Sequence, residues 1–377
     1  MNINNIIYGG YERIRARRKT QRELKHIKDI RYCKIADTYI LSEDNKKAID
    51  EFYLTNYGNK IPYTWHKYYS AHSGVFDCRY FPDLLLRPYF EHYINLNRNY
   101  AFVFEDKNVL PYIASSADVK MPKTILSRTC GIMRDGDSRI VSDREAQDIL
   151  TSNGEVFCKS STGSYGGKGC FVADFNVIKE PVKEVLDDLG SDFVIQEKIV
   201  CHKSIASIYP KSVNTFRVIT YRWKEDFIQL PVFMRVGQGG NVVDNGAAGG
   251  MFLGVHDDGS LTDKAVMPYN TCILSHPDTG FVFKGHRIEH FEKVCDAAKR
   301  MHGMMPMVGM VYWDFTIDKE GEPILIECNI FSGTIYAIQM THGVPAFGDR
   351  TAEVLQWIRK MKHTPYSKRG DYAFGNM

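Results

Sequence analysis

Residues 311–329 read VYWDFTIDKEGEPILIECN, and this stretch has the pattern of an antiparallel hairpin. Its middle, DKEGEP, is rich in turn formers, and apolar residues flank it on both sides. With the turn centred between Glu320 and Gly321, Asp314 lies directly opposite Glu327. Glu327 and Asn329 are two residues apart, so their side chains point to the same face of the strand. The pattern predicts two carboxylates and one amide oxygen close together.

Carboxylates at cross-strand distance repel each other unless a cation lies between them. Acids embedded in apolar strands such as WDF and LIECNI are also costly unless they are compensated. Mg²⁺ prefers oxygen ligands and commonly combines one or two carboxylates with phosphate oxygens of a substrate. We therefore predict that Asp314, Glu327 and Asn329 bind Mg²⁺, with Mn²⁺ as a substitute. The alternative is an edge hairpin whose acids are solvated.

A second motif, VFCKSSTGSYGGKGCFV at 156–172, combines a lysine with a glycine-rich loop. An apolar run leads into Lys159, and a second apolar run begins at Cys170. The loop between them contains Gly163, Gly166, Gly167 and Gly169. Glycines let backbone N–H groups approach phosphate oxygens, and a lysine neutralises phosphate charge.

This loop differs from three common nucleotide motifs. It is not a Walker A motif, because Lys168 is followed by glycine rather than Ser or Thr. It is not a dinucleotide-binding fingerprint, because it returns to a strand instead of opening a helix. Protein kinases place their lysine after the loop, not before it. On its own, a glycine-rich turn is more often structural than functional.

The texture of the sequence changes near residue 100. Residues 10–100 read mostly helical and are crowded with aromatic side chains, which favours a rigid packed core over a stacking platform. Beyond residue 100, short apolar runs alternate with turns and with helical stretches, among them 142–152, 287–304 and 348–363. This mixture indicates an α+β or α/β architecture. The tail, 365–377, is expected to be flexible.

Composition excludes several classes of protein. No apolar run reaches the ~18 residues that cross a bilayer, and the first residues have no apolar signal-peptide region. The nine cysteines are scattered without a CxxC pair, which argues against a zinc site or a disulfide framework and fits a reducing cytosol. We therefore expect a cytoplasmic protein.

The net charge of +3 conceals a basic segment at residues 11–31, where nine Lys and Arg stand against three acids. Ile14, Leu24, Ile27 and Ile30 recur there at a loosely helical period. Such a helix either lies on an anionic membrane surface or acidic polymer, or is a solvated helix packed on its domain. Since only this segment is basic and no nucleic-acid motif accompanies it, a nucleic-acid partner is not expected.

The order of these motifs resembles the ATP-grasp superfamily: a lysine, a glycine loop, the run Gln196-Glu197-Lys198-Ile199, and then Asp…Glu-x-Asn. The resemblance implies that ATP is held between two α+β subdomains. Lys107, in FEDKNVLPYI, matches the first phosphate-binding lysine, and Lys159 matches the second. The remaining nucleotide positions that match are Gly166, Gly167 and Gly169 in the phosphate loop, and Glu197, Lys198 and Ile199 in the adenine hinge.

A closer resemblance is to the sugar-transfer-associated ATP-grasp subgroup, and it covers roughly residues 70–345. It is carried by GVFDCRYFPD, EDKNVLPYI, VKMPKTI, SVNTFRVITYR, MRVG, VDNGAAGG and WDFTID…ILIECN. We expect an α+β protein with the ATP-grasp fold in three parts. Residues 1–105 form a helical, aromatic-rich region, residues 106–200 the subdomain with the glycine loop, and residues 201–377 the subdomain with the metal hairpin.

The resemblance implies an ATP-dependent carboxylate–amine ligase that forms an amide through an acyl phosphate. Arg217 and Arg235 then stabilise the developing negative charge, and residues 237–250 form either a loop that closes over the substrate or an ordinary hairpin connection. The subgroup's name suggests that an amino acid or similar amine is joined to a uronic-acid sugar in surface-polysaccharide synthesis. The alternatives are a small-molecule kinase on the same fold and a non-catalytic nucleotide-binding scaffold.

Overall fold

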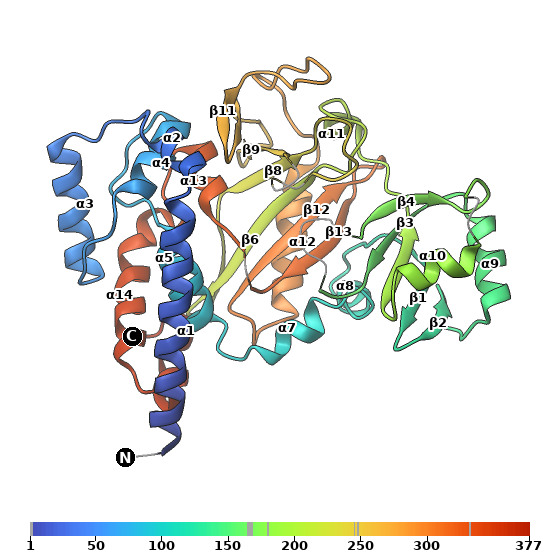
Figure 1. Ribbon diagram of the computed structural model, residues 1–377, viewed down its shortest axis with the longest axis horizontal. Coiled ribbons are helices and arrows are strands. Elements are labelled where there is room, and N and C mark those ends of the chain that lie inside the picture. Colours follow the sequence, from blue (N-terminus) through green and yellow to red (C-terminus); the bar gives the residue numbers. More distant parts are fainter. Residues whose placement is uncertain (1–2, 164–168, 179–180, 245, 247–248, 332) are drawn as a thin grey trace.

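The computed structural model describes residues 3–163, 169–178, 181–244, 246, 249–331 and 333–377 of the chain. Within these residues the strands form two antiparallel sheets, the larger in the middle of the view and the smaller to its right (Figure 1). The smaller sheet has the order β2-β1-β5-β3-β4, and the larger has the order β11-β10-β9-β8-β6-β12-β13, with β7 paired to β6. Together with the helices, these sheets confirm the predicted α+β architecture.

The smaller sheet carries two helices. Its strands are β1 (Thr124–Thr129), β2 (Ile132–Asp135), β3 (Glu155–Ser160), β4 (Phe171–Asp174) and β5 (Phe193–Glu197). Helix α9 (Asp143–Ser152) begins at a capping box in which Ser142 and Glu145 satisfy each other's backbone N–H groups. Leu150 of α9 and Leu186 of α10 (Val182–Asp188) pack on the sheet in a hydrophobic core of their own.

The larger sheet separates two further cores. Its strands are β6 (Thr215–Trp223), β7 (Asp226–Gln229), β8 (Val232–Val236), β9 (Met251–Val255), β10 (Ala265–Met267), β11 (Asn270–Ile273), β12 (Met310–Ile317) and β13 (Pro323–Asn329). Val311, Trp313 and Phe315 of β12 pack with helix α12 (Phe291–Gly303). Side chains alternate along a strand, so Tyr312 and Asp314 point to the opposite face.

Helices from both ends of the sequence cover that opposite face (Figure 1). They are α1 (Ile3–Ile27), α2 (Ile30–Ala36), α3 (Glu43–Asn56), α4 (Thr64–Ser73), α5 (Asp83–Leu85), a π-helical turn (Leu86–Phe90), α6 (Glu91–Ile94), α13 (Tyr336–His342) and α14 (Thr351–His363). The short helices α7 (Asn99–Phe104), α8 (Leu110–Ser116) and α11 (Lys203–Ala206) join the remaining parts. Phe90 stacks edge-on against Phe347 and Trp357, so the aromatic crowding is a packed core, as predicted.

Helix α1 is present as predicted, but only two of its four predicted apolar positions, Leu24 and Ile27, pack against the core. Ile14 is 57% exposed and Ile30, just beyond the helix, is 66% exposed. The buried side instead carries charged groups: Glu12 accepts from His92 Nε2 at 2.7 Å, and Glu23 lies 3.0 Å from Arg87. The apolar period identified the buried side only at the end of the helix, where Ile27 is buried and Leu24 packs against the same core, because charged groups occupy the buried side elsewhere.

The C-terminal tail contradicts the expectation of flexibility. Residues Tyr366–Gly375 form 3₁₀ turns, and Trp357 Nε1 donates to the backbone oxygen of Tyr372 at 2.8 Å. The guanidinium of Arg369 is buried and lies 3.2 Å from the carboxylate of Glu12 in α1. Among the described residues, no helix is both long and apolar enough to span a bilayer.

Candidate functional site

A cavity of about 690 Å³ lies where the two sheets face each other, and both contribute to its lining. The smaller sheet and its hinge supply Lys159 and the stretch 196–200, and Lys107 lies beside them. The larger sheet supplies five polar side chains from strands β6, β8, β12 and β13: Arg217, Arg235, Asp314, Glu327 and Asn329. The structure therefore brings together all the predicted catalytic, lysine and metal-binding side chains.

The hairpin β12–β13 pairs Asp314 with Glu327, as the sequence predicts. The turn is centred on Glu320 rather than between Glu320 and Gly321, because Phe315 pairs with Leu325 and Thr316 with Ile324. A bulge at Ile326 inserts one extra residue into β13 and restores the pairing of the two acids. The bulge thus positions Glu327 toward the cavity instead of leaving it one residue out of register.

Two arginines bind the carboxylate of Asp314, which is 1% exposed. Arg217 Nε donates to Asp314 Oδ1 at 2.6 Å, and Arg235 Nη2 lies 2.8 Å from Asp314 Oδ2. Strand register explains the contact, since Arg217 and Asp314 are direct partners across β6 and β12. Burial raises the pKa of the Asp314 carboxyl, and the two guanidinium groups oppose that rise.

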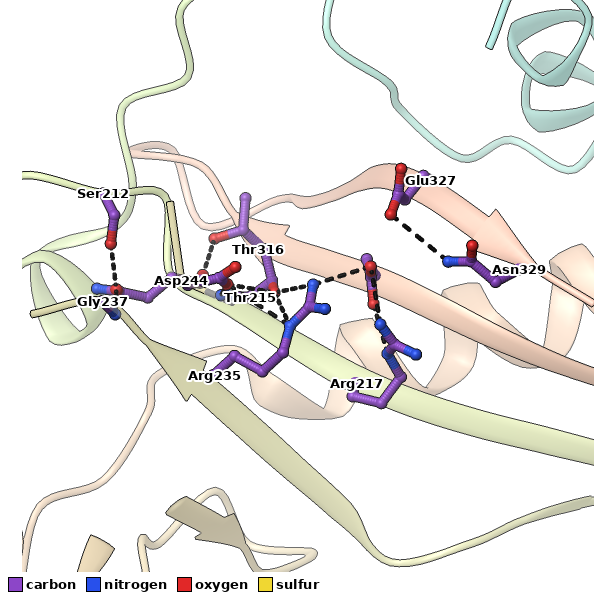
Figure 2. A network of polar contacts seen from close by, with 11 residues as sticks. Ser212, Thr215, Arg217, Arg235, Gly237, Asp244, Thr316, Glu327 and Asn329 are labelled. Carbon is purple, nitrogen blue, oxygen red and sulfur yellow. Dashed lines mark hydrogen bonds and ion pairs between the residues drawn. The ribbon is translucent and has the colours of Figure 1, made fainter. Parts of the chain in front are cut away.

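Arg235 is the centre of a polar network on β6 and β8 (Figure 2). Its Nε and Nη2 donate to Thr215 Oγ1 at 3.0 and 2.7 Å, and Asp244 lies 3.7 Å away. Asp244 also accepts from the backbone N–H of Thr215 at 2.9 Å. Burial lowers the pKa of the Arg235 guanidinium. The carboxylates of Asp244 and Asp314 raise this pKa by more, so the net shift is upward. This network fixes the guanidinium plane at the cavity wall.

Sequence reasoning did not identify Asp244 as part of the site. It stands in the glycine-rich stretch between β8 and β9, which pair with each other antiparallel. The available signal was its place in VDNGAAGG, one of the stretches that carry the family resemblance. Asp244 is 6% exposed, so it is a buried anchor of the site rather than a surface acid.

Glu327 occupies a more open and more positive environment than Asp314. Lys107 Nζ lies 3.3 Å from Glu327 Oε2, and Asn329 Nδ2 lies 3.5 Å from Glu327 Oε1. Burial raises the pKa of Glu327, but Lys107, Lys159 and the two arginines outweigh burial and lower it to about 2. Glu327 is therefore ionised at neutral pH, and Asn329 lies next to it on the same face of β13, as predicted.

The two lysines form a buried, cationic end of the cavity. Lys159 is 3% exposed, and no carboxylate among the described residues forms an ion pair with its ammonium group. Burial and the neighbouring charge of Lys107 lower the pKa of Lys159 to about 8. A buried ammonium without an ion-pair partner is costly. Phosphate oxygens would supply the missing negative charge, so this pair of lysines fits a bound polyphosphate.

The predicted hinge residues Glu197, Lys198 and Ile199 all line the cavity. The Glu197 carboxylate accepts from the backbone N–H of Lys123 at 3.0 Å, and Lys198 Nζ lies 2.7 Å from Glu155. Both charged side chains are thus bound to neighbours in the smaller subdomain. This arrangement suits a segment that contributes its main chain and Ile199 to the cavity.

The glycine loop is described only at its ends. Gly163 and Gly169 both have positive φ, at 68° and 71°, where a side chain would be strained. Gly166 and Gly167, which the sequence assigns to phosphate binding, lie outside the described residues. The oxygen set of Asp314, Glu327 and Asn329 fits the preference of Mg²⁺ for carboxylate and amide oxygens.

Two sheets that enclose a cavity lined by lysines and by a carboxylate hairpin are the arrangement of the ATP-grasp fold. The family described as sugar-transfer associated ATP-grasp matches residues 86–353, most of the chain. The chain therefore belongs to the sugar-transfer associated ATP-grasp family, as its motifs predicted. No curated protein sequence matches it.

Solved structures with a similar fold have low sequence identity to this chain. L-amino acid ligase from Bacillus licheniformis is 12% identical with a TM-score of 0.39, and the match covers 68% of this chain and 48% of that one. N5-carboxyaminoimidazole synthetase from Staphylococcus aureus, complexed with ADP, is 13% identical with a TM-score of 0.38, covering 65% and 52%. D-alanyl-alanine synthetase A from Vibrio cholerae is 14% identical with a TM-score of 0.41, covering 68% and 64%.

Proposed function

We propose that the chain is an ATP-dependent carboxylate–amine ligase that joins an amino acid or similar amine to a uronic-acid sugar in polysaccharide synthesis. A carboxylate oxygen of the acceptor attacks the γ-phosphorus of ATP, ADP leaves, and an amine displaces phosphate from the acyl phosphate to give an amide. The observation that carries the proposal is one cavity that contains two buried lysines, an acid–amide hairpin and two arginines. Membership of the family supports it.

Each half of the cavity has its own task in this proposal. Residues 106–200 and 201–377 clamp ATP between them, and residues 1–105 form a helical region beside the second part. Lys107 and Lys159 bind the phosphates, and the loop glycines Gly166, Gly167 and Gly169 cover them. Glu197, Lys198 and Ile199 hold the adenine. Asp314, Glu327 and Asn329 would hold Mg²⁺ or Mn²⁺, which neutralises charge on the terminal phosphates when bound.

Arg217 and Arg235 are placed to stabilise negative charge on the acceptor. Both guanidinium groups lie at the cavity wall and are oriented by Asp314, with Thr215 and Asp244 supporting Arg235. A planar guanidinium matches the geometry of a carboxylate or an acyl phosphate. Because these groups are already held in position, little reorganisation is needed when charge develops. Closure of the two halves excludes water that would hydrolyse the acyl phosphate.

The test is ADP release from ATP and Mg²⁺ across a panel of uronic acids, nucleotide sugars and amino acids. The proposal expects ADP only when a carboxylate acceptor is present, and hydroxylamine should then trap the acyl phosphate as a hydroxamate. Release of ADP with a phosphorylated hydroxyl and without hydroxamate would instead identify a kinase. Binding of ATP without turnover under any condition would favour the scaffold alternative.

The depressed pKa of Lys159 predicts how nucleotide affinity depends on pH. Phosphate binding requires the protonated ammonium, and the free side chain loses its proton near pH 8. Affinity for a non-hydrolysable ATP analogue should therefore be constant below pH 8 and fall about tenfold for each pH unit above it, since 1.36 kcal/mol corresponds to one pKa unit. Calorimetry at pH 7, 8 and 9 measures this dependence.

The matched variant for this measurement is Lys159→Arg, which stays protonated throughout the range. Its affinity is expected to be lower at pH 7 but to change little up to pH 9. An equally steep decline in this variant would show that another group is responsible, and a flat wild-type profile would contradict the role of Lys159.

We further propose that α1 binds the anionic surface of a membrane from the cytoplasmic side. Its acids, Glu12 and Glu23, are buried, whereas six bases on α1 and just after it are exposed: Arg13, Arg17, Arg18, Arg22, Lys25 and Lys28. Ile7, Tyr11 and Ile14 follow one another at helical spacing and are each more than half exposed. Exposed bases beside an apolar stripe suit the interface of anionic lipids.

Reversing two of these charges with Arg17→Glu and Arg18→Glu should weaken binding to vesicles of anionic phospholipid at least about 30-fold, since each base lost contributes about 1 kcal/mol near such a surface and each introduced acid is repelled by it. Co-sedimentation measures the effect. The matched control reverses the charges of Lys284 and Lys319, which are exposed and lie within residues 201–377. Both double variants change the net charge by the same amount. Equal loss in both variants, or binding to neutral vesicles, would contradict the proposal.

A further inference from the structure

Three side chains outside the cavity bring metal-ligating atoms together. His202, Glu289 and His290 each offer one nitrogen or oxygen atom, and these atoms all lie within 4.8 Å of one another. None of the three residues lines the nucleotide cavity. The group is therefore separate from the oxygen set of Asp314, Glu327 and Asn329, and its chemistry differs because two of its three members are imidazoles.

Ser204 orients His202 and links it to the segment that carries the other two side chains. His202 Nδ1 lies 2.9 Å from Ser204 Oγ, and that hydroxyl accepts from the backbone N–H of Glu289 at 3.3 Å. Nδ1 also faces the backbone N–H of Ser204 at 3.3 Å, so binding a metal through Nε2 requires Nδ1 to carry the proton and donate it to the Ser204 hydroxyl. A histidine that binds a metal usually donates its other ring N–H in this way, which fixes both tautomer and orientation.

His290 is held in place by its backbone and by a glycine opposite. Its φ of 65° lies in the left-handed region, and its ring packs on Gly321 in the turn of the β12–β13 hairpin. A Cβ at position 321 would lie 2.7 Å from His290 Cδ2, so the turn makes room for the ring. Its ring meets that of His202 edge-on at 5.4 Å, and no described residue forms a hydrogen bond with its ring nitrogens.

We propose that His202, Glu289 and His290 bind one Zn²⁺ ion. Two imidazoles and one carboxylate are a common zinc ligand set, with water in the fourth position. Tetrahedral zinc with bonds of roughly 2.1 Å needs ligand atoms roughly 3.4 Å apart, so the side chains close by little more than 1 Å. Glu289 is exposed, and its ion pair with Lys203 at 3.6 Å is long and exposed enough to be given up.

The ion would join two segments at the edge of the nucleotide site, and one of its ligands packs on a third. His202 directly follows the hinge at 196–201 and donates its backbone N–H to Ile317 at the end of β12. His290 is the N-cap residue of α12, and Gly321 belongs to the hairpin that carries Glu327. Zinc therefore stabilises the junction between the hinge and the larger sheet. The scattered cysteines argued against zinc, but this site uses none of them.

The test is zinc binding by the full chain after treatment with a chelator and alkylation of accessible thiols, without ATP. Titration against a chromogenic chelator should give one equivalent of Zn²⁺ per chain, and the ion should raise the Tm. His290→Asn, which tolerates the left-handed backbone, and Glu289→Gln, which is exposed, should each weaken binding at least about tenfold. His363→Ala, an exposed histidine in α14, should bind as the wild type does.

Two outcomes would overturn the zinc site. The first is no stoichiometric zinc in the wild-type chain, and the second is unchanged affinity in Glu289→Gln, which is expected to fold normally. Substituting Co²⁺ gives an independent measure, because a tetrahedral nitrogen and oxygen site has a visible absorption spectrum that a solvated ion lacks. Neither measurement uses turnover, so the ligase proposal can fail while the zinc site stands. The zinc site can likewise fail while the ligase proposal stands.

Discussion

Glu327→Gln is expected to lower ATP turnover about 10³-fold while leaving the chain folded. The substitution keeps the shape of the side chain but removes one of the two carboxylates that face each other on the hairpin. It also leaves Lys107 without the carboxylate that lies 3.3 Å from it. Losing a charged group that acts on the reacting phosphates typically costs 10²- to 10³-fold in rate, and this residue would act on the metal and a lysine together.

Steady-state ADP release at saturating ATP, with Mg²⁺ varied, measures the effect. The matched control is Glu320→Gln, an exposed acid in the turn of the same hairpin, for which turnover should remain within about twofold. Higher Mg²⁺ should partly restore Glu327→Gln if the carboxylate binds the ion. A variant that turns over ATP at the wild-type rate would remove Glu327 from the proposed site.

Asp314→Asn, unlike Glu327→Gln, is expected to lose stability as well as activity. Asp314 is buried against Arg217 and Arg235, and neither guanidinium has another carboxylate within 3.5 Å among the described residues. Breaking a buried ion pair from one side costs about 3–5 kcal/mol, since the remaining charge stays desolvated. Chemical denaturation monitored by fluorescence should show this loss as a lower midpoint with an unchanged slope.

The control for Asp314 is Glu322→Gln, which removes a partly exposed ion pair with Lys293 on the same hairpin and should cost less than about 1 kcal/mol. A double variant, Asp314→Leu with Arg235→Met, should be less destabilised than the sum of its two single variants, since removing both partners leaves fewer unpaired charges. Additive effects would mean that Arg235 and Asp314 do not stabilise each other.

The hairpin and Lys159 were the most predictable parts of the molecule. Turn formers between two apolar runs are a local signal, and strand alternation places Glu327 and Asn329 on one face. No local signal marked the bulge at Ile326. The predicted pairing of Asp314 with Glu327 was correct because two errors cancelled: the turn centre was misplaced and the bulge was missed. Bulges depend on packing between strands, which a single sequence does not display.

Contacts between distant segments were the least predictable. Lys107 and Glu327 are separated by more than 200 residues, and their proximity followed only from the family resemblance. The network of Thr215, Arg235 and Asp244 required the register of β6 against β8, which the sequence alone does not reveal. The packed tail was missed for the same reason: its polar composition indicates flexibility, but Arg369 has a buried partner in α1.

That ion pair between Glu12 and Arg369 has a consequence for how the protein is made. The two residues are 357 positions apart, and ribosomes add about 5–20 residues per second. Glu12 therefore waits roughly 20–70 s for its last partner to be synthesised. Throughout that interval the first helix of a growing chain lacks part of its anchoring, and it is then most accessible to chaperones, to proteases and to any lipid surface it meets.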